Sequence, residues 1–220
     1  YVPGWPGHVA GQHLDARLTE ENGYTAQRSY SLASASEPDR LHLTVQRVAS
    51  GEVSPYLVES ARPGDQFEVR GPVGGYFTWH PDDPGPVLLV AGGSGIVPLM
   101  SMLRTRAAAG SQAPFRLIYS VRSPADLIYA AELRRRARDD HGLEVGYVYT
   151  RRTPDGWPQP PGRLDAATLA AAGWPADADP RIFVCGPTGF VETVAELLVD
   201  QGHAATRIKT ERFGPTGGGR

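Results

Sequence analysis

The first third of the chain is a series of short segments rich in β-forming residues, separated by turn-forming residues. In the clearest segment, Leu41, Leu43 and Val45 alternate with polar residues, which is the period of a strand with one buried face. The turn signals at 21–23 and 63–65 are rich in Asn, Gly, Pro and Asp. The pattern predicts a small antiparallel β-barrel, with one short helix at 54–61 and strands at 13–18, 27–33, 41–48 and 66–70.

A proline-rich segment at 80–86 separates this part from the rest, because three prolines in seven residues can continue neither a helix nor a strand. After it, apolar runs alternate with helical patterns, beginning with an unbroken apolar strand at 87–91. A capping box formed by Ser123 and Asp126 predicts the start of one of the helices. Strands that alternate with helices predict a doubly wound parallel sheet. We therefore expect a β-barrel domain at 1–82 and an α/β domain at 83–220, with strands at 87–91, 115–121, 145–150, 181–185 and 206–211 and helices at 97–109, 124–138, 166–172 and 188–201.

Composition narrows the chemistry that this sequence can carry. The net charge of −2 gives no global support for nucleic-acid binding. No apolar run approaches the roughly 20 residues of a membrane span. The single cysteine, Cys185, excludes a disulfide framework and a four-thiolate cluster within the sequence, and the six histidines form no pair at ligand spacing. We therefore expect no metal site, a cytoplasmic location, and redox chemistry that depends on an organic cofactor.

A glycine-rich loop follows the strand at 87–91 and opens the next helix. Its residues are Gly92, Gly93, Ser94 and Gly95, and Pro98 lies in the first helical turn. Backbone N–H groups and a helix N-terminus can bind a pyrophosphate in such a loop, since glycines let the backbone approach closely. Pro98 stands where the dinucleotide fingerprint has its last glycine, so the alternative interpretation is a plain tight turn.

Two more candidate segments lie in the β half. An Arg-Ser-Tyr-Ser sequence at 28–31 lies on a predicted strand, where Arg28 and Tyr30 share one face and present a cation beside an aromatic ring. The alternative is an ordinary solvated strand face. A second glycine-rich loop at 71–77 could form an anion-binding backbone nest, or a bulged loop at a barrel corner; it contains Gly74, Gly75 and Tyr76.

The last candidate segment ends the fourth α/β strand and opens a helix, and it consists of Cys185, Gly186 and Pro187. Ligands of such sheets bind at the carboxyl ends of the strands. A positive helix terminus could lower the pKa of the Cys185 thiol. The alternative is a small buried hydrophobic residue, which is the commoner role of a lone cysteine.

These segments, in this order and with a β half before an α/β half, resemble the ferredoxin–NADP⁺ reductase superfamily from about residue 11 to 213. The resemblance implies FAD and a nicotinamide nucleotide as cofactors, with a hydride passing from NAD(P)H to FAD. Electrons would then leave to a separate soluble acceptor, such as ferredoxin or another iron–sulfur protein. On the FAD side, the resemblance implies that Arg28 pairs with the pyrophosphate, Tyr30 stacks on the isoalloxazine ring and Ser31 lies near its N5. It also places the pyrophosphate against Gly74, Gly75 and Tyr76.

On the nucleotide side, the resemblance implies that the loop from Gly92 to Pro98 binds the pyrophosphate. Cys185, Gly186 and Pro187 would lie close to the nicotinamide C4. Glu211 would lie nearby, and the ring of Phe213 would cover the flavin face that the nicotinamide must reach. Ser120 and Arg122 occupy the region where NADPH-dependent relatives hold the 2′-phosphate, and a guanidinium suits a phosphate, so NADPH is favoured over NADH.

The sequence departs from the family pattern at both ends. Seven residues follow Phe213, where plant-type members end at the aromatic residue, and the barrel pattern begins one strand late, so the first strand is expected to be absent. The alternative function is a nucleotide-binding regulatory module without turnover, and the set of Arg28, Tyr30, Gly74 and Gly75 favours the enzyme. A basic cluster could dock an acidic partner or could be a solvated helix face; its members are Arg134, Arg135, Arg136 and Arg138.

Overall fold

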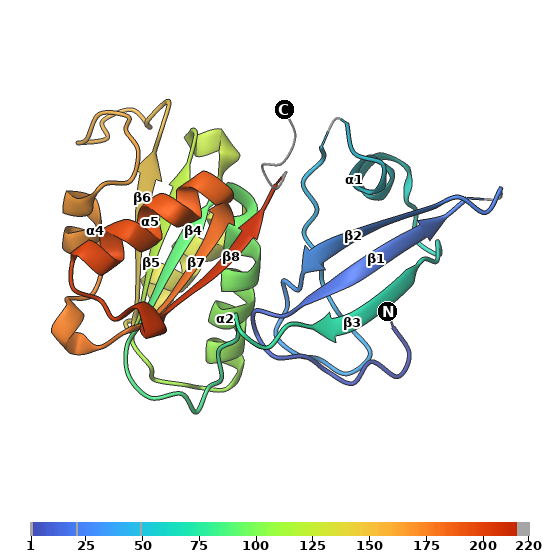
Figure 1. Cartoon of the computed structure of the whole chain (residues 1–220), viewed down its shortest axis with the longest axis horizontal. Helices are drawn as coiled ribbons and strands as arrows, with labels where there is room; N and C mark the ends of the chain where they lie inside the picture. Colours follow the sequence, from blue (N-terminus) through green and yellow to red (C-terminus); the bar gives the residue numbers. More distant parts are fainter. Residues whose placement is uncertain (1, 21, 49, 215–220) are drawn as a thin grey trace.

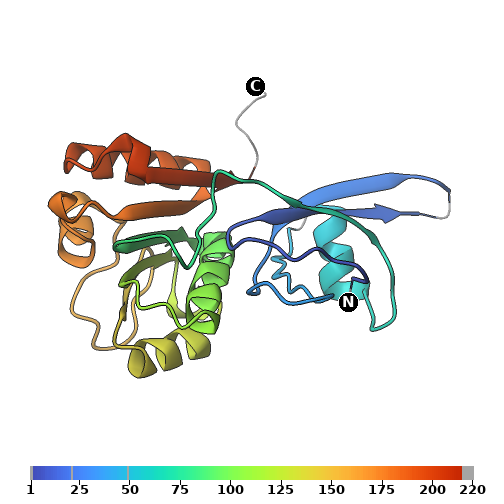
Figure 2. The same ribbon diagram turned by 90° about the horizontal axis from the view of Figure 1, so that it is seen from below.

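A computed structural model describes residues 2–20, 22–48 and 50–214 of the chain. An antiparallel three-stranded sheet is followed by a parallel five-stranded sheet with helices on both faces, which confirms the predicted fold class (Figure 1). Helix α2 (Ile96–Ala108) lies between the two sheets in both Figure 1 and Figure 2. Within the described residues, no helix is long and apolar enough to cross a membrane.

The antiparallel sheet has the strand order β2-β1-β3, with β1 at His13–Thr19, β2 at Thr25–Ser31 and β3 at Glu68–Val73. Its apolar face packs around Trp5, Leu14 and Leu32, which are buried. The predicted short helix is confirmed as α1 (Val53–Pro55), which continues as a π-helical turn at Tyr56–Ser60.

The predicted strand at 41–48 does not form. Leu43 makes an isolated antiparallel bridge with Leu32, and no strand is assigned from Thr44 to Val48. Side-chain hydroxyls take the place of strand carbonyls: the N–H of His42 donates to Ser34 Oγ at 3.3 Å, and that of Val48 to Ser54 Oγ at 3.1 Å. Leu41 and Leu43 still pack against the apolar cluster, as the alternation predicts.

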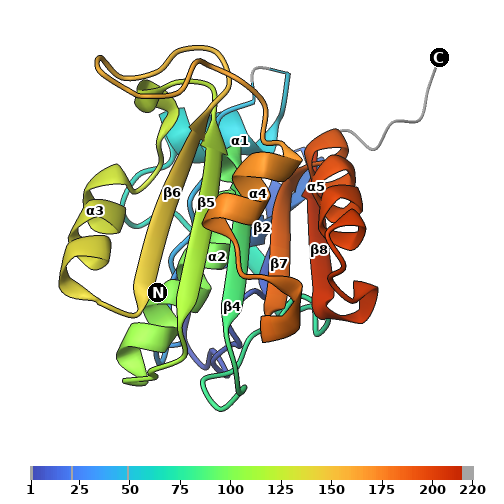
Figure 3. The same ribbon diagram turned by 90° about the vertical axis from the view of Figure 1, so that its left-hand side faces the viewer.

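The parallel sheet has the order β6-β5-β4-β7-β8. The strand that comes first in the sequence, β4, is buried along its whole length and lies at the centre of the sheet. Helices α2 and α3 cover one face and α4 and α5 the other (Figure 3). The chain turns from one side of the sheet to the other between β4 and β7, and ligands of such sheets bind at this switch point. The bounds are β4 Val87–Gly92, β5 Phe115–Val121, α3 Ala130–Asp139, β6 Leu143–Tyr149, α4 Ala166–Ala172, β7 Arg181–Pro187, α5 Thr188–Asp200 and β8 Ile208–Phe213, with short 3-10 turns at Gly93–Gly95, Pro124–Asp126, Ala176–Ala178 and Ala205–Arg207.

The helix predicted at 124–138 begins later than the capping box indicates. Residues 124–126 form only a 3-10 turn, and Ser123 Oγ bonds the carboxylate of Asp126 at 2.6 Å instead of capping the helix. Tyr129 then adopts a left-handed backbone conformation, with φ at 61°, which breaks any continuous helix at this point. Helix α3 therefore starts at Ala130.

Segments that flank the antiparallel sheet pack into the apolar cluster on the α2 side of the parallel sheet. Ala33, Phe77 and Trp79 from the antiparallel part pack in the same cluster as Leu99 and Met102 of α2. At the carboxyl-terminal edge of the parallel sheet, Ser94 and Phe213 line one cavity together with residues of β2 and α1.

Candidate functional site

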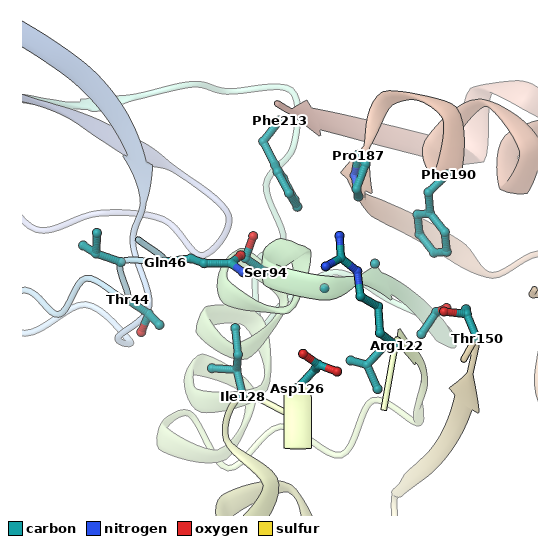
Figure 4. Close-up of a pocket in the computed structure, with 15 residues that line it drawn as sticks. Thr44, Gln46, Ser94, Arg122, Asp126, Ile128, Thr150, Pro187, Phe190 and Phe213 are labelled. Carbon is teal, nitrogen blue, oxygen red and sulfur yellow. The ribbon is translucent and has the colours of Figure 1, made fainter. Parts of the chain in front are cut away.

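The carboxyl-terminal ends of the five parallel strands border a cleft of about 570 Å³. Figure 4 shows side chains from several of these strand ends facing one space. The lining residues at the strand ends are Gly92 of β4, Ser120 and Val121 of β5, Thr150 just after β6, Pro187 of β7 and Phe213 of β8. A cleft at this edge of a doubly wound sheet is typical of nucleotide binding.

The glycine-rich loop forms one side of the cleft, where Gly92, Gly93 and Ser94 line it. No side chain caps α2 and no acidic residue lies in its first turn, so its N-terminal end favours an anion. Gly95 is required by packing, because a Cβ there would lie 2.1 Å from the carbonyl oxygen of Cys185 on β7. Pro98, which the resemblance placed at the nucleotide, is buried in α2 and is not among the lining residues.

Ser120 and Arg122 both line the cleft. Ser120 is buried, whereas Arg122 is exposed and its backbone carbonyl accepts bonds from the N–H groups of the next loop at 151–152, at 2.9 and 3.1 Å. Asp126 lines the same cleft. The cleft therefore holds a carboxylate close to the predicted phosphate site, which sequence analysis had assigned to helix capping.

A second cavity of about 710 Å³ lies against the antiparallel part. Arg28, Tyr30 and Ser31 line it together, and the start of α1 faces them with residues 51–54. Arg28 is exposed, and its guanidinium donates a hydrogen bond to the carbonyl of Gln27 at 2.6 Å. The two cavities adjoin each other and share four lining residues, which are Thr44, Gln46, Ser94 and Phe213.

The structure does not bring the second glycine-rich loop to either cavity. Gly74 has φ at 97° and lies against the ring of His13, so that an added Cβ would be 3.4 Å from His13 Nδ1. The Tyr76 side chain is 62 % exposed, and its hydroxyl donates to the carbonyl of Ile208 on β8 at 3.2 Å. Gly74, Gly75 and Tyr76 thus lie at the junction between the two sheets, apart from Arg28 and Tyr30.

Cys185 and Glu211 form a partly buried polar contact, with 3.8 Å between Sγ and Oε2. Burial raises the pKa of Glu211 to about 7, and burial together with the Glu211 charge raises the pKa of the Cys185 thiol well above its ordinary value. The idea that a helix terminus lowers the Cys185 pKa is therefore wrong, because burial raises the pKa of this thiol. His13 Nδ1 lies 3.8 Å from Glu211 Oε1 and joins β1 to this pair.

Comparisons with known proteins agree with this geometry. The chain matches the oxidoreductase FAD-binding domain family at residues 6–78 and the oxidoreductase NAD-binding domain family at 89–196. It is 35% identical to ferredoxin–NADP reductase B of Sorangium cellulosum over 210 residues, which is 93% of this chain and 84% of that protein. The chain belongs to the ferredoxin–NADP⁺ reductase superfamily.

Other superfamily members are similar over a part of their length. The glycine betaine monooxygenase reductase subunit of Pseudomonas aeruginosa is 33% identical over 208 residues, covering 94% of this chain and 56% of the relative, so the chain spans little more than half of it. The flavohemoprotein of Deinococcus radiodurans is 30% identical over 96% of this chain and 53% of its own. The FAD/NAD-binding domain of the nitric oxide dioxygenase from Vibrio cholerae has a similar fold, with a TM-score of 0.83, 27% identity, and coverage of 94% and 86% of the two chains.

The side chains present fit the two cofactors of this superfamily. An exposed guanidinium and the Tyr30 ring line the cavity next to the antiparallel sheet, which suits a pyrophosphate and a flat ring. The cleft of the parallel sheet offers an uncapped helix start and the cation Arg122, which suit a phosphorylated nucleotide. In the part of the chain that the structure describes, no group of His, Cys, Asp and Glu could hold a metal ion.

Sequence analysis missed several cavity residues of this superfamily member. Thr44 and Gln46 line both cavities, Phe190 lines the cleft, and residues 51–54 face Arg28. The Gly-x-x-Ser sequence at 51–54, directly before a predicted short helix, was the signal that could have found the last group. Thr44 and Gln46 carried no such signal, because the alternation assigned them only to an ordinary strand.

Glu211 should make the protein less stable as the pH rises from about 4.5 to 7. The folded protein keeps a proton on Glu211 until about pH 7, whereas the unfolded chain loses it near 4.5, so the folded state binds more protons in this window and the free energy of unfolding falls. Glu211→Gln should remove this fall and exceed the wild type in stability by up to about 3 kcal/mol at pH 8. Urea unfolding at pH 5 and pH 8 measures the free energy of unfolding of both proteins. Glu192→Gln is the control, because Glu192 is exposed. Identical pH profiles for Glu211→Gln and wild type would contradict the pKa of Glu211.

Proposed function

We propose that this chain is a reductase module that takes a hydride from NADPH onto FAD and passes electrons to a separate protein acceptor. The observation that carries the proposal is the junction of the two cavities, which share Thr44, Gln46, Ser94 and Phe213. Bound FAD supplies the redox chemistry, since a flavin accepts a hydride and can release its two electrons singly. The chain itself supplies binding, orientation and exclusion of water.

Each cavity then has a defined task. Arg28 would pair with the FAD pyrophosphate, while Tyr30 and Ser31 would face the isoalloxazine ring. The loop of Gly92, Gly93 and Ser94 would hold the pyrophosphate of the nicotinamide nucleotide against the start of α2. Phe213 is partly buried and lines both cavities, so its ring would have to turn aside when the nicotinamide approaches the flavin.

The preference for NADPH rests on Arg122, and Asp126 opposes it. A guanidinium binds a 2′-phosphate in a charge-assisted pair, whereas a carboxylate in this region favours the ribose hydroxyls of NADH. Arg122→Ala should raise the KM for NADPH about tenfold and leave the KM for NADH nearly unchanged. Steady-state kinetics with both nucleotides measure this, with Arg135→Ala on the exposed side of α3 as control. An equal change in the KM for both nucleotides would show that Arg122 does not bind the 2′-phosphate.

The acceptor is inferred from the relatives. The relatives include a monooxygenase reductase subunit, a ferredoxin reductase and a flavohemoprotein. Iron–sulfur and heme groups are therefore both candidate acceptors. We propose an iron–sulfur protein or domain, because this chain covers 84% of the ferredoxin reductase but little more than half of the flavohemoprotein. The basic cluster on α3 gives this proposal little support, since Arg136 pairs with Glu132 and Arg138 with Asp139.

A one-electron acceptor distinguishes the reductase from a regulatory module without turnover. The FAD-loaded protein should reduce about two equivalents of ferricyanide or cytochrome c for each NADPH oxidised, because a hydride carries two electrons. The oxidation of NADPH and the reduction of the acceptor are followed at separate wavelengths. Tight nucleotide binding without oxidation of NADPH would favour the regulatory module.

A further inference from the structure

The wall between the two cavities is a segment without regular secondary structure. Thr44, Val45 and Gln46 line the nucleotide cleft, and Thr44 and Gln46 line the second cavity as well. Figure 4 shows Thr44 and Gln46 on one side of the cleft, apart from Phe213 and Pro187. Because Leu43 makes only an isolated bridge and no strand follows it, backbone ladders do not fix this wall. Its position must depend on side-chain contacts.

The contact from the parallel-sheet side comes from Tyr129, whose hydroxyl shares a hydrogen bond with Thr44 Oγ1 across 85 positions of sequence. Tyr129 lies just before α3 and has a left-handed backbone with φ at 61°. An aromatic residue in this conformation is strained, and such strain persists where the surroundings hold the residue and occurs at functional sites. The neighbouring Ile128 lines the cleft, and its N–H donates to the hydroxyl of Tyr119 at 3.3 Å.

Arg104 on α2 holds Tyr129 and the antiparallel part together. Its guanidinium carbon lies 4.8 Å from the centre of the Tyr129 ring, and its Nη1 donates to the carbonyl of Ala33 at 2.7 Å. Its other nitrogens bind both carboxylate oxygens of Glu132 on α3, at 3.1 and 2.5 Å. The Arg104 and Glu132 side chains are only 20 and 19 % exposed, so solvent weakens this pair little. Ser101 adds a bond from its hydroxyl to the carbonyl of Ser34 at 2.7 Å.

We propose that Tyr129 is a positioning residue that fixes the 44–46 wall between the nucleotide cleft and the flavin cavity, with Arg104 as its support. The role of this wall in catalysis rests on the proposed function. The lock itself, which consists of the contacts of Tyr129 with Thr44 and Arg104, is a property of the fold. The lock ties the nucleotide side of the molecule to the surface that both cofactors would contact. A displacement of Tyr129 would therefore move Thr44 and alter the lining of both cavities.

Amide hydrogen exchange of residues 42–48 in the FAD-loaded protein tests the lock, because the N–H groups at both ends of this segment donate to serine hydroxyls. Tyr129→Phe keeps the ring over Arg104 and removes only the hydroxyl, and Thr44→Val removes the same bond from the other side. Each variant should accelerate exchange of these amides about tenfold, and the double variant should be no faster than either single one. Tyr147→Phe is the matched control, because Tyr147 is a half-buried tyrosine of β6 that lines neither cavity. Its exchange at 42–48 should equal that of the wild type.

Two results would overturn the proposal: wild-type exchange at 42–48 in Tyr129→Phe, or effects of the two single variants that multiply in the double one. Thr44→Val gives an independent reading that leaves the backbone of Tyr129 intact. The kinetics separate this lock from the proposed function. Under the proposal, Tyr129→Phe also raises the KM for the nucleotide severalfold while the FAD content stays that of the wild type. If the wild-type protein oxidises no NADPH and the exchange pattern still appears, the proposed function fails and the lock stands.

Discussion

Gly95→Ala should abolish most of the reduction by NADPH, with a loss of about 100-fold in rate. The added Cβ would lie 2.1 Å from the carbonyl oxygen and 2.4 Å from the carbonyl carbon of Cys185, both of which belong to the central part of the parallel sheet. Backbone atoms of a buried strand cannot move aside, so the glycine-rich loop must shift away from the cleft. Stopped-flow reduction of the FAD-loaded variant by NADPH measures the loss.

Stability and a second glycine separate this effect from general damage. The overpacking at Gly95 should also lower the free energy of unfolding by about 1–3 kcal/mol. Gly189→Ala is the control, because Gly189 lies in the first turn of α5 and an added Cβ there would meet nothing within 4 Å. A Gly95→Ala protein that NADPH reduces as fast as the wild type would show that the loop does not hold the nucleotide.

Arg28→Ala should weaken the binding of FAD about 10- to 100-fold, because it removes a charge-assisted contact to the pyrophosphate. Arg28 lines the cavity next to the antiparallel sheet and is in none of the ion pairs found among the described residues. Its charge is therefore available to a ligand. The loss is measured by flavin fluorescence during titration of the apoprotein with FAD.

Arg70→Ala is the matched control for this substitution. Arg70 is an exposed arginine on β3 of the same sheet, and it lines neither cavity. The Arg70→Ala protein should bind FAD like the wild type. Equal affinities of the Arg28→Ala protein and the wild type would move the pyrophosphate to another part of the cavity, such as residues 51–54.

Local sequence patterns predicted those parts of the fold that local forces decide. The unbroken apolar run at 87–91 became the buried central strand β4, because only a strand covered on both faces can bury every side chain. The glycine-rich loop after it lies at the cleft, because its glycines allow a tight turn from the strand into the helix. Arg28 and Tyr30 line one cavity, but Ser29 and Ser31 line it as well, so the period of two on the strand does not separate the two pairs.

Contacts between distant residues decided the parts that could not be predicted. The segment at 41–48 has the alternation of a strand, but the N–H groups of His42 and Val48 donate to the hydroxyls of Ser34 and Ser54. The helix at 130–139 starts late because Tyr129 is held in a left-handed conformation next to Thr44. The loop at 74–76 contains the glycines of an anion-binding nest, yet Tyr76 bonds to β8, 132 positions away. No local pattern contains these partners.

The most direct test of the account is the visible absorption spectrum of the purified protein after incubation with FAD, recorded before and after anaerobic addition of NADPH and, separately, of NADH. The account predicts flavin bands with about one FAD per chain, and prompt bleaching that is faster with NADPH than with NADH. A protein that retains no flavin bands after removal of free FAD, or that binds FAD but is not bleached by either nucleotide, would contradict it.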